Sequence, residues 1–169
     1  MNFTKKQHER SLEIDALCAE FRGKFLSTGA WIETILSEML TQQFCPDPNR
    51  RALFFSELMD SGDITFSRKT ELLTTVLDRF HPQLLGAHPK LKERLDKFRR
   101  FRNRLAHSHP DTSEARLNDG KSDEVVFVFY EVGQTKYQTV TLTEAEQRIA
   151  ESNQLHNELV EILNAIKVA

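Results

Sequence analysis

The sequence predicts a mainly helical fold, a bundle of four to five helices with a β-hairpin inserted before the last helix. Over most of the 169 residues, apolar side chains recur every three or four positions, which is the period of an amphipathic helix. The stretch at about 123–142 departs from this period, because it is rich in the β-branched and aromatic residues that favour strands. Prolines and capping residues separate the helical stretches. The length of the chain is that of one domain, so we expect a single domain over residues 1–169.

The first helix is expected from about Leu12 to Phe44. Its apolar residues fall at helical spacing and predict one buried face. They are Leu17, Phe21, Phe25, Trp31, Ile35 and Met39. Asp47 can cap a second helix that has Pro48 in its first turn and reaches about Met59.

Ser67 is expected to cap a third helix, which ends before Pro82. Pro89 opens a fourth helix. This helix is expected to end near His107, because Pro110 disfavours helical geometry at the residue before it.

An arginine falls inside the apolar stripe of this fourth helix. On a wheel of about 100° per residue, the stripe consists of Leu91, Leu95, Phe98 and Leu105, with Phe101 at its edge. Arg102 lies within the stripe, four residues after Phe98 and three before Leu105. Burying a guanidinium is costly unless it is paired or reaches a wet site. Arg102 therefore needs either a carboxylate partner, for which Glu33 and Glu57 are candidates, or a ligand.

A polar loop follows at residues 112–123. The runs EVVFVFYEV and KYQTVTL, separated by GQT, predict a β-hairpin at about 123–142. Thr143 and Glu146 have the spacing of a capping box and are expected to start the last helix, at about 144–168. Its predicted packing face consists of Ile149, Leu155, Leu159, Ile162 and Ile166.

Several classes of protein are excluded by the composition. No apolar run approaches the ~18 residues of a membrane span, and the N-terminus lacks the apolar segment of a secretory signal, so we expect no membrane partner. Cys18 and Cys45 are isolated and predict neither a disulfide framework nor a zinc knuckle, which favours a cytoplasmic protein. No glycine-rich phosphate loop is present, so a nucleotide triphosphatase is not expected.

The charge is unevenly distributed. The formal net charge is −2, but 90–104 holds eight basic residues and two acidic ones, so this segment carries +6 and the remainder −8. Such a basic segment suits a phosphate-bearing ligand or an acidic partner, although most charge runs are simply solvated helix faces. The candidate phosphate-binding residues are Lys97, Arg99, Arg100, Arg104 and His109.

The end of the basic helix holds a short motif. Asn103 and His107 are four residues apart and share a helix face, whereas Arg102 and His107 are five apart, about 140° around the helix. Residues 102–107, RNRLAH, resemble the Arg-x4-6-His motif of the HEPN superfamily (higher eukaryotes and prokaryotes nucleotide-binding), in the form Arg-Asn-x3-His. The resemblance is specific at 98–110 and extends over most of the chain as architecture. It implies an HEPN-like up-down bundle.

The resemblance also implies a function. It implies a homodimer whose motif helices meet at a two-fold axis, and a metal-independent endoribonuclease with a role as a toxin, in stress or in phage defence. His107 would be the general base or acid at the RNA 2′-hydroxyl, Arg102 would bind the scissile phosphate, and Asn103 would orient the phosphate or the histidine. In members silenced by a nucleotidyltransferase antitoxin, a tyrosine stands two residues after the histidine. Here that residue is His109, so this regulation is not expected, although another antitoxin or protein partner is compatible with the resemblance.

Other interpretations are open at this point. The chain could be a non-catalytic HEPN dimer that binds RNA, a nucleotide or a protein, or a structural helical adaptor, which would leave the +6 segment unexplained. His107 could merely complement the dipole at the helix end, and His109 is expected in a loop beyond it. His107 and His109 could begin a metal site, but no strong third ligand stands nearby, Asp111 being a weak candidate and Glu114 a weaker one, so we expect no metal and no cofactor.

Overall fold

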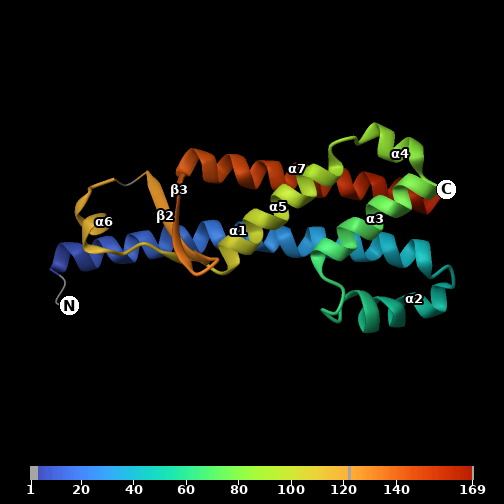
Figure 1. Ribbon diagram of the computed structural model, residues 1–169, viewed down its shortest axis with the longest axis horizontal. Coiled ribbons are helices and arrows are strands. Elements are labelled where there is room, and N and C mark those ends of the chain that lie inside the picture. Colours follow the sequence, from blue (N-terminus) through green and yellow to red (C-terminus); the bar gives the residue numbers. More distant parts are fainter. Residues whose placement is uncertain (1–3, 122, 169) are drawn as a thin grey trace. The chain divides into compact units, whose positions relative to one another are not determined.

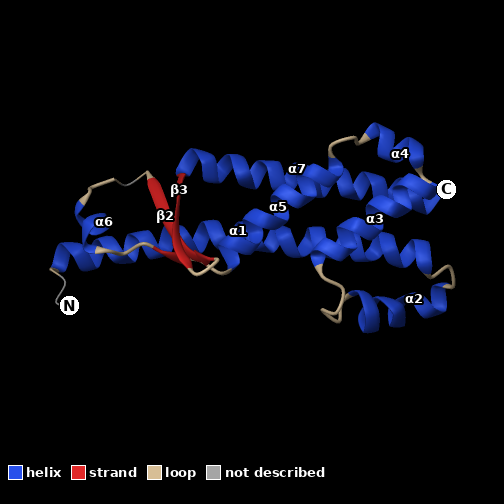
Figure 2. Cartoon of the chain, viewed as in Figure 1, coloured by secondary structure: helices blue, strands red, loops and turns tan. Residues whose placement is uncertain are grey.

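The computed structural model describes residues 4–121 and 123–168. Helices account for most of these residues, and one three-stranded antiparallel sheet accounts for the strands (Figure 2). This confirms the prediction of a mainly helical chain with a hairpin before the last helix. Ser122, in the predicted polar loop, and the predicted domain limits at residues 1 and 169 lie outside the described residues.

The chain forms two compact units. The first unit contains Met1–Ser27 and Phe101–Glu151, and the second contains Thr28–Arg100 and Ser152–Ala169. Three helices contribute residues to both units: α1 (Lys5–Phe44), α5 (Leu91–Ala106) and α7 (Leu142–Val168) (Figure 1).

The first unit contains the whole sheet. Its strands are β1 (His109–Pro110), β2 (Glu124–Glu131) and β3 (Gln134–Thr141), in the order β1-β2-β3, and a short helix α6 (Glu114–Asn118) precedes β2. Burial alternates at the start of β2, as in a half-buried strand, whereas Phe127, Val128 and Phe129 are all buried. The buried face consists of Val125, Phe127, Phe129 and Val140.

An aromatic cluster joins this face to the helices of the first unit. The Phe21 ring of α1 lies 5.9 Å from Phe127 of β2 and 6.2 Å from Phe101 of α5. Phe25 meets Phe101 edge to face at 5.0 Å. Such tilted and edge-on arrangements match the ring quadrupoles, and the cluster fixes the end of α5 against the sheet.

The described residues of the second unit form helices and the loops between them. Besides its parts of α1, α5 and α7, it contains α2 (Pro48–Phe54), a π-helical turn η1 (Phe55–Met59), α3 (Phe66–Phe80) and α4 (Pro82–Ala87). Its largest fully buried side chains lie on four of these helices. They are Ile32, Leu36, Met39 and Leu40 of α1, Leu73 and Leu77 of α3, Leu95 of α5, and Leu159 and Ile162 of α7.

Of the predicted capping residues, one was confirmed and two were wrong. Asp47 caps α2 as predicted, accepting a hydrogen bond from the Asn49 amide at 2.9 Å, and Pro48 is its first residue. The cap of α3 is Thr65, whose hydroxyl accepts from the Arg68 amide at 3.3 Å, and not Ser67.

The capping box of the last helix also lies two residues earlier than predicted. The Thr141 hydroxyl accepts from the Glu144 amide at 3.1 Å, and the Glu144 carboxylate accepts from the Thr141 amide at 3.0 Å. Thr143 and Glu146 lie inside α7, which begins at Leu142 and not at 144.

Four further predictions need correction. Helix α1 begins at Lys5 and not at Leu12, and Trp31, predicted to be on its buried face, is 62% exposed. The polar loop at 112–123 contains helix α6, held by the buried Arg116, whose guanidinium lies 2.9 Å from the Glu124 carboxylate. His109 belongs to strand β1 and not to a loop.

The hairpin turn is Val132–Gly133 and not GQT. Gln134 pairs with Glu131 as the first residue of β3. Both turn residues have a positive φ, 51° at Val132 and 72° at Gly133, which is the two-residue turn that matches the twist of the strands. Glycine adopts this conformation freely, whereas a β-branched valine is strained in it.

Candidate functional site

The last turn of α5 positions the three motif residues. Arg102 and Asn103 are helical, and α5 ends at Ala106. The His107 amide still donates to the Asn103 carbonyl at 3.3 Å, so the backbone keeps helical hydrogen bonding for one residue beyond the helix. The Asn103 and His107 side chains are exposed, and Arg102 is half-buried.

Phe101, and not Arg102, completes the apolar stripe of α5. Phe101 is 8% exposed and contacts the rings of Phe21 and Phe25, while Arg102 lies at the border of the stripe. Its half-buried position leaves part of the Arg102 side chain accessible to a ligand.

Arg102 and Asn103 are joined through their side chains. The Arg102 Nη1 donates to the Asn103 Oδ1 at 3.2 Å. Because the amide oxygen accepts this bond, the Asn103 amide nitrogen points its two hydrogens away from the guanidinium, where they can donate to an anion. The pair thus presents guanidinium and amide donors together at the surface.

His107 points elsewhere on the same helix end. Five residues separate it from Arg102, which corresponds to about 140° of rotation. One protomer therefore brings Arg102 and Asn103 together, while His107 lies on the face of Asn103 and about 140° from Arg102.

The segment after His107 is anchored on both sides. The Ser108 carbonyl accepts a hydrogen bond of 2.6 Å from Nη2 of Arg22 in α1, and the buried Ser108 hydroxyl donates to the Leu105 carbonyl at 2.9 Å. Strand β1 follows at once, and the Asp111 amide donates to the Val126 carbonyl at 2.8 Å. His107 is thus held between a capped helix end and a sheet.

Sequence reasoning missed Arg22 and Ser108. The bond between them joins residues 86 positions apart, and neither belongs to a recognisable local motif. The one available signal was the position of Arg22 directly after Phe21, beside the buried face of α1.

Two of the five predicted phosphate-binding residues belong to the same unit as the motif. The Arg104 side chain is 45% exposed; its guanidinium lies 3.7 Å from the Glu131 carboxylate and 5.5 Å from the centre of the Phe129 ring. His109 is exposed on β1, with its ring 6.4 Å from the ring of Tyr130. Arg104 is thus partly neutralised, and His109 is accessible.

The other three lie on the part of α5 that belongs to the second unit. Lys97 and Arg100 are exposed, and the Arg99 guanidinium lies 3.7 Å from the Asp96 carboxylate of the preceding turn. Lys97 and Arg100 are therefore the more accessible cations of this group.

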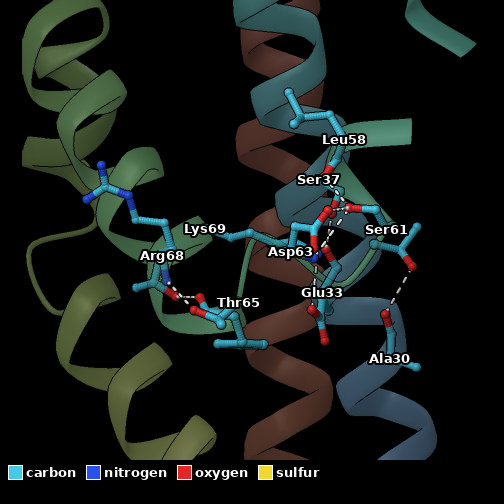
Figure 3. A network of polar contacts seen from close by, with 12 residues as sticks. Ala30, Glu33, Ser37, Leu58, Ser61, Asp63, Thr65, Arg68 and Lys69 are labelled. Atoms are coloured by element: carbon cyan, nitrogen blue, oxygen red, sulfur yellow. Dashed lines mark hydrogen bonds and ion pairs between the residues drawn. The ribbon is translucent and has the colours of Figure 1, made fainter. Parts of the chain in front are cut away.

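Glu33, one of the two carboxylates considered as a partner for Arg102, pairs with a lysine of its own unit. The Lys69 ammonium of α3 lies 3.0 Å from Oε1 of Glu33 in α1 (Figure 3). The Glu57 carboxylate accepts from the hydroxyl of its neighbour Ser56 at 3.3 Å.

The two cysteines do not add a nucleophile. Both are buried, and burial raises the pKa of the Cys18 thiol to about 12 against the nearby Arg22 charge, which lowers it. The thiolate is the reactive form, so Cys18 is inert near neutral pH. Across 4–121 and 123–168, no group of three or more His, Cys, Asp or Glu side chains is arranged to hold a metal ion.

Within the same described ranges, no helix has the length and apolar character needed to cross a membrane. Comparison of the chain with protein-family models, with curated proteins and with solved structures finds no match.

Proposed function

We propose that this protein is a metal-independent endoribonuclease of HEPN type. In this proposal the chain forms an HEPN-like up-down bundle and acts as a homodimer in the cytoplasm. The observation that supports it best is the accessible end of α5, where the Arg102 guanidinium is bonded to the Asn103 amide and His107 is exposed one residue beyond the helix. These are the residue types that phosphodiester transfer requires.

The reaction is an attack by the RNA 2′-oxygen on the adjacent phosphorus. One imidazole takes the proton of the 2′-hydroxyl as the new O–P bond forms, and the bond to the 5′-oxygen of the next nucleotide breaks. A protonated imidazole gives its proton to that leaving oxygen, so the products are a 2′,3′-cyclic phosphate and a 5′-hydroxyl. Imidazole suits both roles because it exchanges a proton near neutral pH.

Arg102 and Asn103 stabilise the charge that develops on the phosphate. A guanidinium can bridge two phosphate oxygens, and its attraction increases as negative charge accumulates in the transition state. The Arg102–Asn103 bond of 3.2 Å holds the two groups ready before RNA binds, which lowers the cost of organising them.

The direction of the side chains supports the homodimer. On an ideal helix Arg102 and His107 diverge by about 140°, so they meet only if the long arginine reaches round, if His107 sits in a frayed last turn, or if a second motif helix brings its own histidine opposite the arginine; we favour the third. A two-fold axis through the α5 ends supplies it, and the two His107 side chains then share the roles of base and acid.

The basic residues of α5 would hold the RNA backbone. Lys97, Arg99, Arg100, Arg104 and His109 are the candidates, with Arg99 and Arg104 weakened by their carboxylate neighbours. Each phosphate contact releases counterions, so the affinity for RNA falls with salt. A role as a toxin, in stress or in phage defence, with or without an antitoxin, belongs to the same proposal.

The test is cleavage of an end-labelled RNA pool in EDTA. Wild-type protein should cleave it and leave cyclic phosphate ends, whereas Arg102→Ala and His107→Ala should lower the rate by about 100-fold or more. The matched controls are Arg79→Ala and His8→Ala, which remove an exposed arginine and an exposed histidine outside the motif. No cleavage by a folded, dimeric wild-type protein would refute the nuclease and favour a non-catalytic HEPN dimer that binds RNA, a nucleotide or a protein.

A further inference from the structure

The outer face of the three-stranded sheet is aromatic. His109 of β1, Val128 of β2 and Tyr137 of β3 are paired in one row across the sheet, and cross-strand partners share a face. Tyr130, two residues further along β2, lies on this face too, because the side-chain period of a strand is two. We call these four residues the outer aromatic patch.

The patch is open to solvent. Tyr130 is 72% exposed and Tyr137 is 66% exposed, and they are the two tyrosines of the whole chain. The His109 and Tyr130 rings lie 6.4 Å apart and are tilted by 32°, so both can offer a face to the same ligand.

An exposed sheet face usually carries polar or charged side chains. Here Val128 is 6% exposed although it points away from the buried face, and its cross-strand neighbours are His109 and Tyr137. Val128 is thus the buried centre of the row, and the rings of His109, Tyr130 and Tyr137 are its exposed part. The core residues Val125 and Phe127 lie on the opposite face.

Two carboxylates of β2 near the patch are paired with cations. Glu124, on the outer face, lies 2.9 Å from Arg116 and 3.4 Å from Lys121, and Glu131, on the other face, lies 3.7 Å from Arg104. The Asp111 carboxylate, two residues after His109, accepts from the Ser113 amide at 3.0 Å. The patch therefore offers its ligand ring faces, and we assign the phosphate contacts to the basic residues of α5.

The patch also adjoins the motif. His109 follows His107 by two residues, which is roughly 7 Å of extended chain at most. A ligand that stacks on His109 and Tyr130 therefore extends directly to the group that we assign to proton transfer.

We propose that the outer aromatic patch is a stacking subsite for unpaired nucleobases next to the cleaved bond. This rests on the proposed function. Aromatic rings stack on every base, and stacking contributes about 1–3 kcal/mol per base in single-stranded complexes. Paired bases hide their faces inside a helix, so the patch selects unpaired RNA.

The test uses the full chain and a short unpaired RNA that contains 2-aminopurine, whose emission falls on stacking. The His107→Ala background and EDTA prevent cleavage during the titration. Tyr130→Ala and Tyr137→Ala should each weaken binding about 5- to 150-fold, the equivalent of the loss of one stacked base. Tyr130→Phe and Tyr137→Phe should bind within about twofold of the parent, because the ring is retained.

Three measurements separate stacking from other effects. The salt dependence of binding should be the same in the alanine variants as in the parent, because no phosphate contact is lost. A fully paired RNA of the same sequence should bind parent and variants equally. Phe80→Ala, which removes an exposed aromatic side chain (58%) from α3, should leave binding unchanged.

Other results would overturn the subsite. Unchanged binding in both alanine variants would do so, as would an equal loss for paired and unpaired RNA. If the alanine variants turned from dimers into monomers, the patch would be an interface between copies of the chain. Absence of cleavage by the wild type refutes the nuclease but leaves the stacking titration readable, so the two failures are distinguishable.

Discussion

The buried ion pair of the second unit should respond very differently to removal of its two partners. Lys69 is 2% exposed, and its ammonium lies 3.0 Å from a carboxylate oxygen of Glu33, whose side chain is 29% exposed (Figure 3). An ammonium taken out of water costs several kcal/mol unless a partner compensates it. Because the Glu33 side chain is partly exposed to solvent, its carboxylate keeps part of its hydration.

Glu33→Leu should therefore be the damaging change. It leaves the Lys69 ammonium buried without its carboxylate, and we expect a loss of about 3 kcal/mol in the free energy of unfolding, the lower end of the range for broken buried pairs because Glu33 is partly exposed. For a chain of this length, that loss corresponds to a fall in Tm of roughly 6–12 °C. Glu33→Gln keeps a hydrogen-bond acceptor and should lie between Glu33→Leu and wild type.

Lys69→Met should cost within about 1 kcal/mol, because methionine keeps an unbranched apolar side chain and removes the desolvated charge. The double variant Glu33→Leu, Lys69→Met should recover most of the loss seen in Glu33→Leu. Urea unfolding of the full chain, with an unchanged m-value, measures the free energy of unfolding of all four variants. The control is Glu20→Gln, which breaks the exposed pair of Glu20 with Lys24 and should have no measurable effect. If Lys69→Met destabilises as much as Glu33→Leu, the reasoning is refuted.

Three further predictions concern the first unit. Val132→Asn should raise the free energy of unfolding by about 1 kcal/mol, because asparagine tolerates a positive φ and the valine, which is 96% exposed, loses little packing. The β-branched control Val132→Thr should give no gain in the same urea experiment. The pKa of Cys18 is raised from 9.0 to about 12, so its contribution to the free energy of unfolding is fully present below pH 9.0 and is lost as the pH rises toward 12. In Cys18→Ala the free energy of unfolding should therefore decline less steeply over this alkaline range. An equally steep decline would contradict the assignment to Cys18. Arg22→Met should remove the hydrogen bond to the Ser108 carbonyl and lower kcat for RNA more than it changes KM, because the segment after His107 loses its anchor. Restoration of kcat by Arg22→Lys would support a role of Arg22 in positioning His107. A change in KM alone would argue against that role.

The fold class was predictable because the spacing of apolar residues, and the prolines and capping residues between the helices, are local properties of the sequence. The exact caps were not, since Thr65 and Ser67, or Thr141 and Thr143, stand two residues apart and have equal capping chemistry. Which of them caps depends on where the buried face of each helix begins, and that is decided by packing. Trp31 illustrates the same limit, because helical spacing cannot tell the border of a buried face from its centre.

The candidate site was predictable to the extent that it is local. The motif at 102–107 lies on one helix end, so its residues could be named from the sequence alone. The choice of Phe101 over Arg102 for the buried stripe could not, because on the helix wheel Arg102 lies within the stripe and Phe101 only at its edge; contacts with Phe21 and Phe25 bury Phe101 instead. The anchor of Ser108 by Arg22 depends on residues 86 positions apart and needed the structure.

The positions of the aromatic chromophores give this protein a built-in means of observation. The single tryptophan, Trp31, belongs to the second unit, and both tyrosines belong to the first. Light at the red edge of the absorption band excites tryptophan alone, so its emission reports on the second unit, while tyrosine absorbance reports on the first. Coincident transitions would indicate that the two units unfold together, and separate transitions would give the stability of each without any label.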